Sequence, residues 1–400
     1  MTGGAESPAL RRRIPLWLLT AYGVGVMVGA GIYVLVGAVA GQAGLYAPLA
    51  FVIAGVVALP SALSYAELAS RMPEAAGEAA FVEAGFQSRA MALVVGLAIV
   101  VAAMVSAAAV LRGGVGYFVT LVPVETWAAI LAGGTILTLV AIAGVLESLA
   151  FAALFTLAEV VGLLAVAAVG LGAEPVAGWA APPAPEWAGV AGAVALCFFA
   201  FIGFEDIENL AEEVREPRRT LPRAILLSLA ITAVLYALVS FAAVRAVPRE
   251  ALSQSEQPLA LVWQAATGKS PAFLSAIAVA AAVNGVLAQI VMASRVLYGL
   301  GRRAAWLAPF HEAHPRFRTP LRASLLVGTV AIVAALALPV VALAEVTAAV
   351  ILGVFLAVNV ALILLKRRLP EAPFRVPFWV PVSGLLLSLA ALAAQVWGAA

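Results

Sequence analysis

Residues 25–41, GVMVGAGIYVLVGAVAG, lie inside an apolar run that extends from Ile14 to Ala40. The run is too long for a soluble core helix and too rich in glycine for an unbroken one. Gly29 and Gly31 stand near its middle, where each glycine costs a helix about 1 kcal/mol and lets the backbone leave helical geometry. Unwound backbone at membrane depth survives only where it is buried in protein or lines a wet cavity. The stretch therefore predicts a discontinuous transmembrane helix, the kind that carries the substrate site in transporters.

The composition predicts one polytopic membrane domain over residues 1–400. Of the 400 residues, 64% are hydrophobic and only 11% are charged, whereas soluble domains hold about 45–50% apolar and about 25% charged residues. The net charge of +2 does not indicate a nucleic-acid partner. Cys197 is the only cysteine, which excludes an intramolecular disulfide and a four-cysteine zinc site.

An all-α fold with about eleven transmembrane helices follows from the apolar runs, since a span needs about 20 apolar residues. The first run is longer than the roughly 7–15 apolar residues of a signal peptide, so we expect it to be retained. A short surface helix is expected around 258–267, and the polar stretch 71–89 is broken by Pro73 and Gly77. The predicted spans are 14–41, 46–70, 90–111 (with a possible extension to 121), 126–145, 148–171, 188–213, 222–246, 271–300, 321–338, 341–365 and 377–397.

Basic residues are distributed unevenly between the two sides of these spans. With the N-terminus inside, the inner segments hold 18 of the 23 basic residues and the outer segments hold 4, while Arg295 lies within a span. Such a bias sets orientation in the membrane. We therefore expect a multi-pass cell-membrane protein with a cytoplasmic N-terminus, and the odd number of spans puts the C-terminus outside.

A second break is expected in the sixth span, where residues 197–206 read CFFAFIGFED. The aromatic run turns acidic at Gly203, five spans after the first break. This spacing predicts a core of two five-helix repeats, 14–171 and 188–365, of which the second is inverted, with an extra helix at 377–397. Paired interrupted helices in inverted repeats point to a midplane binding site. Their free N–H groups suit a carboxylate and their free carbonyls an ammonium, so the site fits a zwitterion such as an amino acid.

Several motifs resemble those of the amino acid–polyamine–organocation (APC) permease superfamily. They are GVGVMVGAGIYVLVG at 23–37, SYAELASRMPEAAGEAAFVE at 64–83, FFAFIGFEDIENLAEEVREPRRTLPRAI at 198–225, NGVLAQIVMASRVLYGLGRR at 284–303 and RTPLRA at 318–323. The resemblance implies the leucine-transporter-type (APC) fold, with helices 1 and 6 discontinuous, and transport by alternating access. Two features depart from it: many members have twelve spans, and many carry a lysine in the fifth helix, where this chain has Thr156 to Glu159.

The resemblance also implies the substrate-binding residues. Backbone groups of the first break would hold the substrate carboxylate, and carbonyls of the second break would hold the amine beneath an aromatic ring. The residues concerned are Val28, Gly29, Ala30, Gly31 and Ile32 in the first set, and Phe199, Ala200, Phe201, Ile202 and Gly203 in the second. Alternatively, the glycines of the first set only allow close helix packing, and the aromatic residues of the second set only belong to the core.

Four further residues are candidates for coupling or gating. Glu159 lies about eleven residues into the fifth span, where an unpaired charge costs several kcal/mol, so it is either a proton carrier or a static hydrogen-bonded acid. Glu205 shares a predicted helix face with Glu208 and Glu212, and Arg295 could pair with that face as an inner gate or a static bridge. Asn284 either lines the pocket or holds helices together by hydrogen bonds. Ser294 is a weaker candidate for the same roles. No complete sodium site is recognisable.

The function expected from these features is secondary active transport of amino acids or related small amines. Proton coupling is expected, with exchange as the alternative; a passive channel and a non-transporting sensor are less favoured. The buried set Glu159, Asn284 and Cys197 offers no catalytic constellation, so we expect no enzyme.

His311 and His314 lack further ligands, and Arg112-Gly113-Gly114-Val115-Gly116 lacks a phosphate-loop ending, so we expect neither cofactor nor nucleotide. No acidic residue is expected at the break itself, which argues against a dedicated cationic substrate, and the oligomeric state is open.

Overall fold

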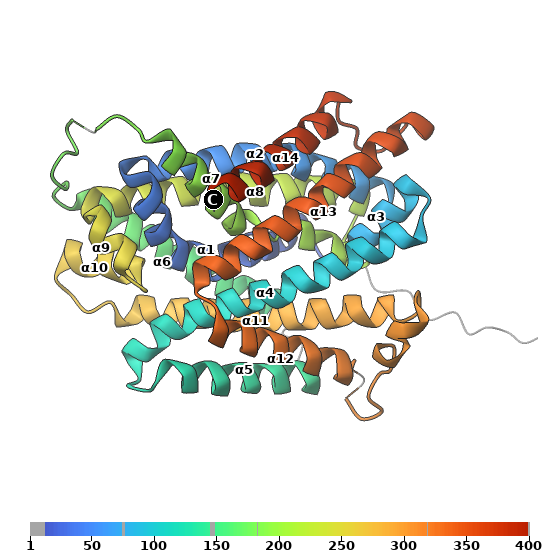
Figure 1. The fold of residues 1–400 in the computed structure, drawn as a ribbon, viewed down its shortest axis with the longest axis horizontal. Coiled ribbons are helices and arrows are strands. Elements are labelled where there is room, and N and C mark those ends of the chain that lie inside the picture. Colours follow the sequence, from blue (N-terminus) through green and yellow to red (C-terminus); the bar gives the residue numbers. More distant parts are fainter. Residues whose placement is uncertain (1–12, 74–76, 145–148, 182, 318, 399–400) are drawn as a thin grey trace, which may run out of the picture.

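A computed structural model describes residues 13–73, 77–144, 149–181, 183–317 and 319–398. These residues form α-helices and short 3-10 helices (Figure 1). The α-helices are α1 Leu16–Ala43, α2 Ala47–Arg71, α3 Gly77–Phe86, α4 Arg89–Leu121, α5 Thr126–Ala143, α6 Leu149–Gly172, α7 Trp187–Phe201, α8 Pro217–Ala246, α9 Arg249–Gln254, α10 Pro258–Thr267, α11 Ala272–Leu300, α12 Leu321–Ala337, α13 Val340–Arg368 and α14 Trp379–Gly398. The 3-10 helices are η1 Gly44–Tyr46, η2 Glu205–Glu213 and η3 Ala305–Phe310.

The helices confirm the prediction of an all-α membrane protein. Within the described ranges, 8 helical stretches are long and apolar enough to cross a membrane, and the shorter apolar helices Leu16–Gly29, Leu321–Ala337 and Trp379–Gln395 accompany them. One of the 8, Gly31–Arg71, joins the second half of α1 to α2. The number of crossings, predicted as eleven, is not established by length and composition.

Element boundaries differ from the predicted spans in two informative places. Helix α8 begins at Pro217, five residues before the predicted start, because proline is well suited to the first turn of a helix. Helix α3 forms inside a stretch that was expected to be only polar and broken. It buries Ala79, Phe81 and Val82, so the segment contributes to the packed core.

The long helices run roughly side by side, with α3 at one end of the bundle and α9 and α10 at the other (Figure 1). We call these the α3 end and the α10 end. Small residues let the helices approach closely: Gly85 of α3 lies against Ala361 of α13, and Gly114 of α4 against Ala282 of α11. Close packing of this kind is expected in a membrane bundle, where van der Waals contact replaces the hydrophobic effect between helices.

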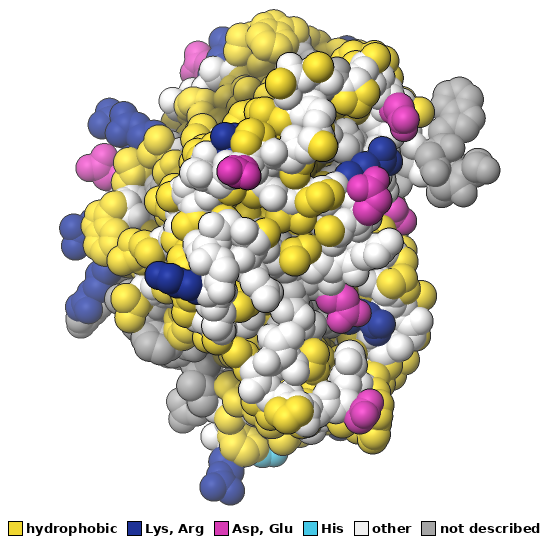
Figure 2. Space-filling view, turned by 90° about the vertical axis from the view of Figure 1, so that its left-hand side faces the viewer, with side chains coloured by type: hydrophobic (Ala, Val, Ile, Leu, Met, Phe, Trp, Pro, Cys, Tyr) yellow, Lys and Arg dark blue, Asp and Glu magenta, His cyan; other side chains and the backbone are white. Residues whose placement is uncertain are grey.

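At the α10 end, helix α9 covers the last turn of α1. The guanidinium of Arg249 donates two hydrogen bonds, of 2.9 and 2.6 Å, to the carbonyl oxygen of Gly41. A cation at a helix C-terminus is stabilised by the helix dipole. Figure 2 views this end of the molecule, where hydrophobic side chains predominate and charges of both signs are scattered.

At the α3 end, a buried ionic network joins α2 to the segment after α13. The Glu67 carboxylate, which is fully buried, pairs at 2.6 Å with both Arg71 and Lys366. It also accepts a 2.8 Å hydrogen bond from the backbone N–H of Val376. The end of α2 and residues 366–376, which are distant in sequence, are thereby held at one point.

Candidate functional site

Both helix breaks predicted from the sequence are present. In α1 the backbone leaves helical geometry at Gly29, with φ 12° and ψ −148°. Helix α7 ends at Phe201, after which Ile202 is extended, with ψ 134°. Gly203 has a φ of 125°, a conformation that residues with a side chain rarely adopt. The interrupted helices therefore expose backbone groups that a continuous helix would satisfy internally.

The two breaks face each other. A Cβ atom added to Gly31 would lie 3.4 Å from the Cα of Ala200, and one added to Gly203 would lie 3.3 Å from the backbone nitrogen of Met27. A Cβ on Gly29, in contrast, would meet no atom within 4 Å, although Gly29 is buried. The first break therefore borders open space inside the protein.

Tyr236 of α8 connects the two breaks. Its hydroxyl donates to the carbonyl of Met27 at 2.6 Å and to that of Ala200 at 2.9 Å. Each carbonyl belongs to the last turn of helix before a break, where its usual N–H partner is missing. One hydroxyl proton serves two acceptors, so acceptor capacity remains for a further donor. The fully buried ring packs edge-on against Phe51 and Phe201.

Glu159 lies beside the break in α1. Helix α6 approaches α1 closely at two points, where Thr156 lies against Gly25 and Gly162 lies against the hydroxyl of Tyr33. Glu159 lies on α6 between these two points. The Tyr33 hydroxyl also donates to the backbone carbonyl of Glu159 at 3.1 Å. The Glu159 side chain is 1% exposed, and neither carboxyl oxygen has a hydrogen-bond partner in the described part of the chain.

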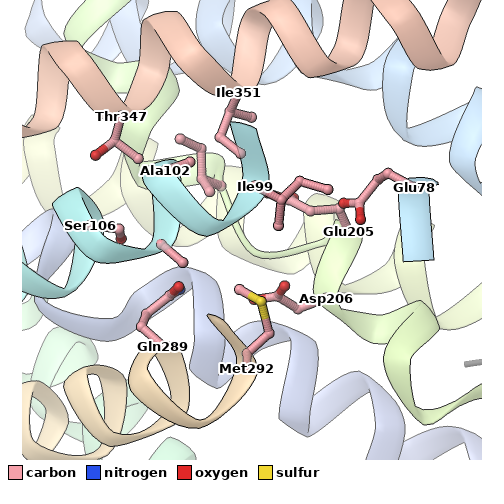
Figure 3. Close-up of a pocket in the computed structure, with 12 residues that line it drawn as sticks. Glu78, Ile99, Ala102, Ser106, Glu205, Asp206, Gln289, Met292, Thr347 and Ile351 are labelled. Atoms are coloured by element: carbon pink, nitrogen blue, oxygen red, sulfur yellow. The ribbon is translucent and has the colours of Figure 1, made fainter. Parts of the chain in front are cut away.

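A pocket extends from the second break toward α3. Three carboxyl groups gather on one side, and Ser106, Gln289 and Thr347 lie on the other (Figure 3). The lining residues are Glu78, Ile99, Ala102, Ala103, Ser106, Ile202, Glu205, Asp206, Gln289, Met292, Thr347 and Ile351.

The three carboxyl groups differ in their surroundings. Glu205 accepts a 2.9 Å hydrogen bond from the backbone N–H of Gly203, so an acid does lie at the break, contrary to the expectation from sequence. Glu78 accepts a long 3.4 Å hydrogen bond from Tyr65, and burial raises the pKa of Glu78 to about 7, with a further contribution from Asp206. The Asp206 carboxylate has no hydrogen bond or ion pair among the described residues, while the Asp206 backbone N–H donates to the carbonyl of Gly203 at 3.2 Å.

The structure brings most of the predicted binding residues together around the breaks. Val28, Gly29, Gly31 and Ile32 are buried at the break of α1, while the side chain of Ala30 lies outside the described residues. Phe199 and Phe201 are also buried, and the Phe199 ring lies 4.0 Å from a Cβ position at Gly31. Phe204 packs instead against Tyr65 and Phe355 in the core. Among the predicted residues, Ile202 and Glu205 line the pocket.

The predicted pairing of Arg295 with the acidic face is not found. Arg295 is exposed on α11, and no ion pair joins it to Glu205 or Glu208 within the described ranges. Arg295 lies on the exposed side of its helix, whereas Glu205 and Glu208 are buried, and Glu205 accepts a hydrogen bond from the backbone N–H of Gly203. The side chain of Glu212 lies outside the described residues.

Helix α11 also meets the pocket through residues other than those predicted. Asn284 does not line the pocket, and the Ser294 hydroxyl bonds to Val291 of its own helix. Gln289 and Met292 line it instead.

Sequence reasoning missed Glu78, Asp206, Gln289 and Tyr236. A signal existed for three of them. Glu78 falls in the motif 64–83, Asp206 falls in the motif 198–225, and Gln289 is a polar residue in an apolar run. No sequence signal distinguishes Tyr236 from the other six tyrosines.

Comparison with known proteins agrees with this geometry. The sequence model of the family described as "Amino acid permease" matches residues 14–400. The branched-chain amino acid permease BcaP of Bacillus subtilis is 29% identical, over 96% of this chain and 88% of its own. The methylthioribose transporter of Bacillus subtilis is 27% identical, over 96% and 87%. The vacuolar cationic amino acid transporter 4 of Arabidopsis thaliana is 30% identical, over 88% and 63%.

The family and these relatives are permeases and transporters, not enzymes. The match extends over both broken helices and nearly the whole bundle. The chain therefore belongs to the amino acid permease family of the APC superfamily.

Proposed function

We propose that this protein is a proton-coupled secondary transporter that carries amino acids across the cell membrane by alternating access. The observation that carries the proposal is the pair of facing breaks beside the open space at Gly29. A single broken helix could be a packing feature, but two facing breaks offer both kinds of backbone group that a zwitterion needs.

The substrate carboxylate would bind free N–H groups at the start of the second half of α1, around Gly31 and Ile32, where the helix dipole favours an anion. The substrate ammonium would bind the carbonyls of Met27 and Ala200, which share one hydroxyl proton of Tyr236. Both contacts recognise the carboxylate and ammonium groups that all amino acids share. They therefore do not select the substrate by its side chain.

The α3 end would face the cytoplasm. The basic segments that the charge bias assigns to the inside include Arg71, Arg303 and Lys366. The N-terminus would lie on the same side, because the chain that precedes α1 pairs with the segment after η2 through Ile14 and Val214.

Glu159 is the proposed proton carrier. Its carboxyl group is buried beside the break of α1 and has no hydrogen-bond partner among the described residues. An unpaired charge there is costly, so proton binding and release at this group would be linked to changes at the break. A lysine occupies this helix in many superfamily members. A lysine is a cation when it holds the proton, whereas Glu159 would be neutral when it holds the proton.

The test uses purified protein in liposomes and a labelled amino acid mixture. Accumulation should follow an inward proton gradient in the wild type. Glu159→Gln should lose this response and still exchange external for internal amino acid. The control is Glu125→Gln, which changes an exposed carboxyl group with no side-chain cap hydrogen bond before α5. A full gradient response in Glu159→Gln would refute the carrier role, and uptake that requires internal amino acid in the wild type would show an exchanger. No uptake under either condition would refute transport.

A further inference from the structure

One exposed stripe runs along helix α8. It begins with Arg219 and Arg223 and continues through Leu227, Ile231 and Val234. Successive members are three or four positions apart, so they lie on one face of the helix. Leu227, Ile231 and Val234 are 44%, 42% and 69% exposed. This face of α8 is therefore open to lipid and ends in two arginines.

The two arginines are not neutralised by the described protein. The Arg223 side chain has no ion pair or hydrogen bond among the described residues. Arg219 lies 3.9 Å from Glu216, and both side chains are more than three-quarters exposed, so water weakens this pair. Residues 213–223 hold four arginines and two glutamates, so positive charge remains at the start of α8.

Arginines in the terminal turns of other helices at the α3 end are mostly occupied by the protein. Arg71 pairs with Glu67, Arg322 pairs with Glu312, Arg368 donates to the carbonyl of Gly85, and Arg367 lies over the ring of Phe378. Arg89 at the start of α4 is paired as weakly as Arg219, at 3.9 Å, but the residue one turn further on is Leu93. A pair of accessible arginines one turn apart, directly above an exposed apolar stripe, therefore distinguishes α8.

The stripe has the dimensions of a phospholipid in one leaflet. Arg223 and Val234 are 11 residues apart, about 16 Å of helix, and half of the hydrocarbon core is about 15 Å thick. Trp17, in the first turn of α1, is 66% exposed, as is typical of tryptophan at the membrane–water interface. One turn further along α1, the carbonyl of Thr20 accepts a 3.1 Å hydrogen bond from the Ser228 hydroxyl of α8. The two guanidinium groups therefore lie near the depth of the lipid headgroups.

We infer that this face of α8 binds an anionic phospholipid, whose phosphate contacts Arg219 and Arg223 and whose acyl chains cover Leu227, Ile231 and Val234. The guanidinium group offers paired N–H donors that match a phosphate, and basic residues at this depth attract anionic lipids. The lipid is a ligand other than the transported solute, so the inference does not depend on the proposed function.

The site borders the segments that lead into both broken helices. The chain before α1 pairs with the segment after η2 through Ile14 and Val214, and the backbone N–H of Arg215 donates to the carbonyl of Ile14 at 3.0 Å. Helix α8 begins two residues after Arg215, at Pro217. A lipid bound at the start of α8 would therefore stabilise this junction.

The test compares two double variants with the wild type. Arg219→Gln with Arg223→Gln removes the two guanidinium groups of the site. The control, Arg302→Gln with Arg316→Gln, removes two exposed charges from the segment between α11 and α12, which is not a lipid-facing helix. Each protein, purified in detergent, is titrated with dioleoyl phosphatidylglycerol and with dioleoyl phosphatidylcholine, whose acyl chains are identical. Native mass spectrometry measures the bound lipid, and the melting temperature measures stabilisation.

We expect the wild type and the control to bind phosphatidylglycerol at least tenfold more tightly than phosphatidylcholine and to melt at a higher temperature with it. In the double variant of the site this preference should fall by about tenfold or more, while binding of phosphatidylcholine should not change.

Three results would overturn the inference. They are an equal preference for phosphatidylglycerol in both double variants, equal binding of the two lipids by the wild type, and stabilisation of the wild type by soluble glycerol 3-phosphate as strong as that by the lipid, which would show a site for free phosphate. The assay needs no uptake, so a failure of transport leaves it unaffected, and a lack of lipid preference leaves the proposed function intact.

Discussion

Glu78 is a buried carboxyl group whose charge changes near neutral pH. It belongs to α3, accepts a hydrogen bond from Tyr65 of α2, and faces Asp206, Glu205 and Glu208 of η2. Burial is the main reason that its pKa lies at about 7 instead of 4.5; the charge of Asp206 raises this pKa further, whereas hydrogen bonds from its own backbone N–H and from Tyr65 lower it. No basic group faces it among the residues that the structure describes.

The sign of the resulting pH dependence follows from this raised pKa. Between pH 4.5 and about 7, the folded protein holds a proton at Glu78 that the unfolded chain has released. The free energy of unfolding therefore falls as pH rises through this window, by on the order of 3 kcal/mol for this group. Glu78→Gln should remove this pH-dependent contribution to the free energy of unfolding. The apparent melting temperature of the variant should therefore fall less than that of the wild type between pH 5 and pH 8. Parallel pH curves for the two proteins would contradict the prediction.

At the scale of elements, the hydroxyl of Tyr236 holds the last turns before both breaks together. Tyr236→Phe keeps the ring between Phe51 and Phe201 but leaves two buried carbonyls with no phenolic donor. We expect a loss of about 1–3 kcal/mol in stability. We also expect at least a tenfold fall in the uptake rate, because the two half-helices no longer keep their relative position.

The uptake rate in liposomes and the melting temperature of the same preparation check this prediction. Tyr46→Phe is the matched control, because the Tyr46 hydroxyl donates to the carbonyl of Pro183 at 2.8 Å near the surface, away from the breaks. If Tyr236→Phe transported as fast as Tyr46→Phe, the hydroxyl would have a stabilising role only.

At the scale of the whole molecule, the Glu67 network determines how the last helix joins the bundle. It connects the end of α2 with the end of α13 and with the segment that leads into α14. A layer of buried polar contacts continues this junction, since Asn359 of α13 bonds to Ser61 and Ser64 of α2. Helix α14 reaches the same layer through Ser388, 3.5 Å from Ser61.

Removal of one partner of a buried ion pair leaves a buried charge without compensation. Glu67→Gln should therefore lower the free energy of unfolding by about 3–5 kcal/mol, measured as thermostability in detergent. The double variant Glu67→Gln with Lys366→Met should recover part of this loss. Glu312→Gln, which removes an exposed pair with Arg322, should cost less than about 1 kcal/mol. Similar losses for Glu67→Gln and Glu312→Gln would show that the network is not important for stability.

Much of the fold could be predicted because lipid restricts the backbone so strongly. Helices in a bilayer must satisfy their own hydrogen bonds, so apolar runs and the glycines at 29 and 203 indicated both the helices and the breaks. Helix α3 was missed, because its buried apolar residues Ala79, Phe81 and Val82 lie in a short stretch next to Pro73 and Gly77.

The sequence by itself determined the class of this protein, the positions of its two breaks and its family, since these depend on local composition and on motifs along the chain. Only the tertiary structure decided which side chains meet. Glu78 and Asp206 lie far apart in sequence but line one pocket, and one hydroxyl of α8 reaches carbonyls of both α1 and α7. The physical reason is that such contacts depend on the rotation and depth of each packed helix, which hydrophobic periodicity along a single helix does not specify.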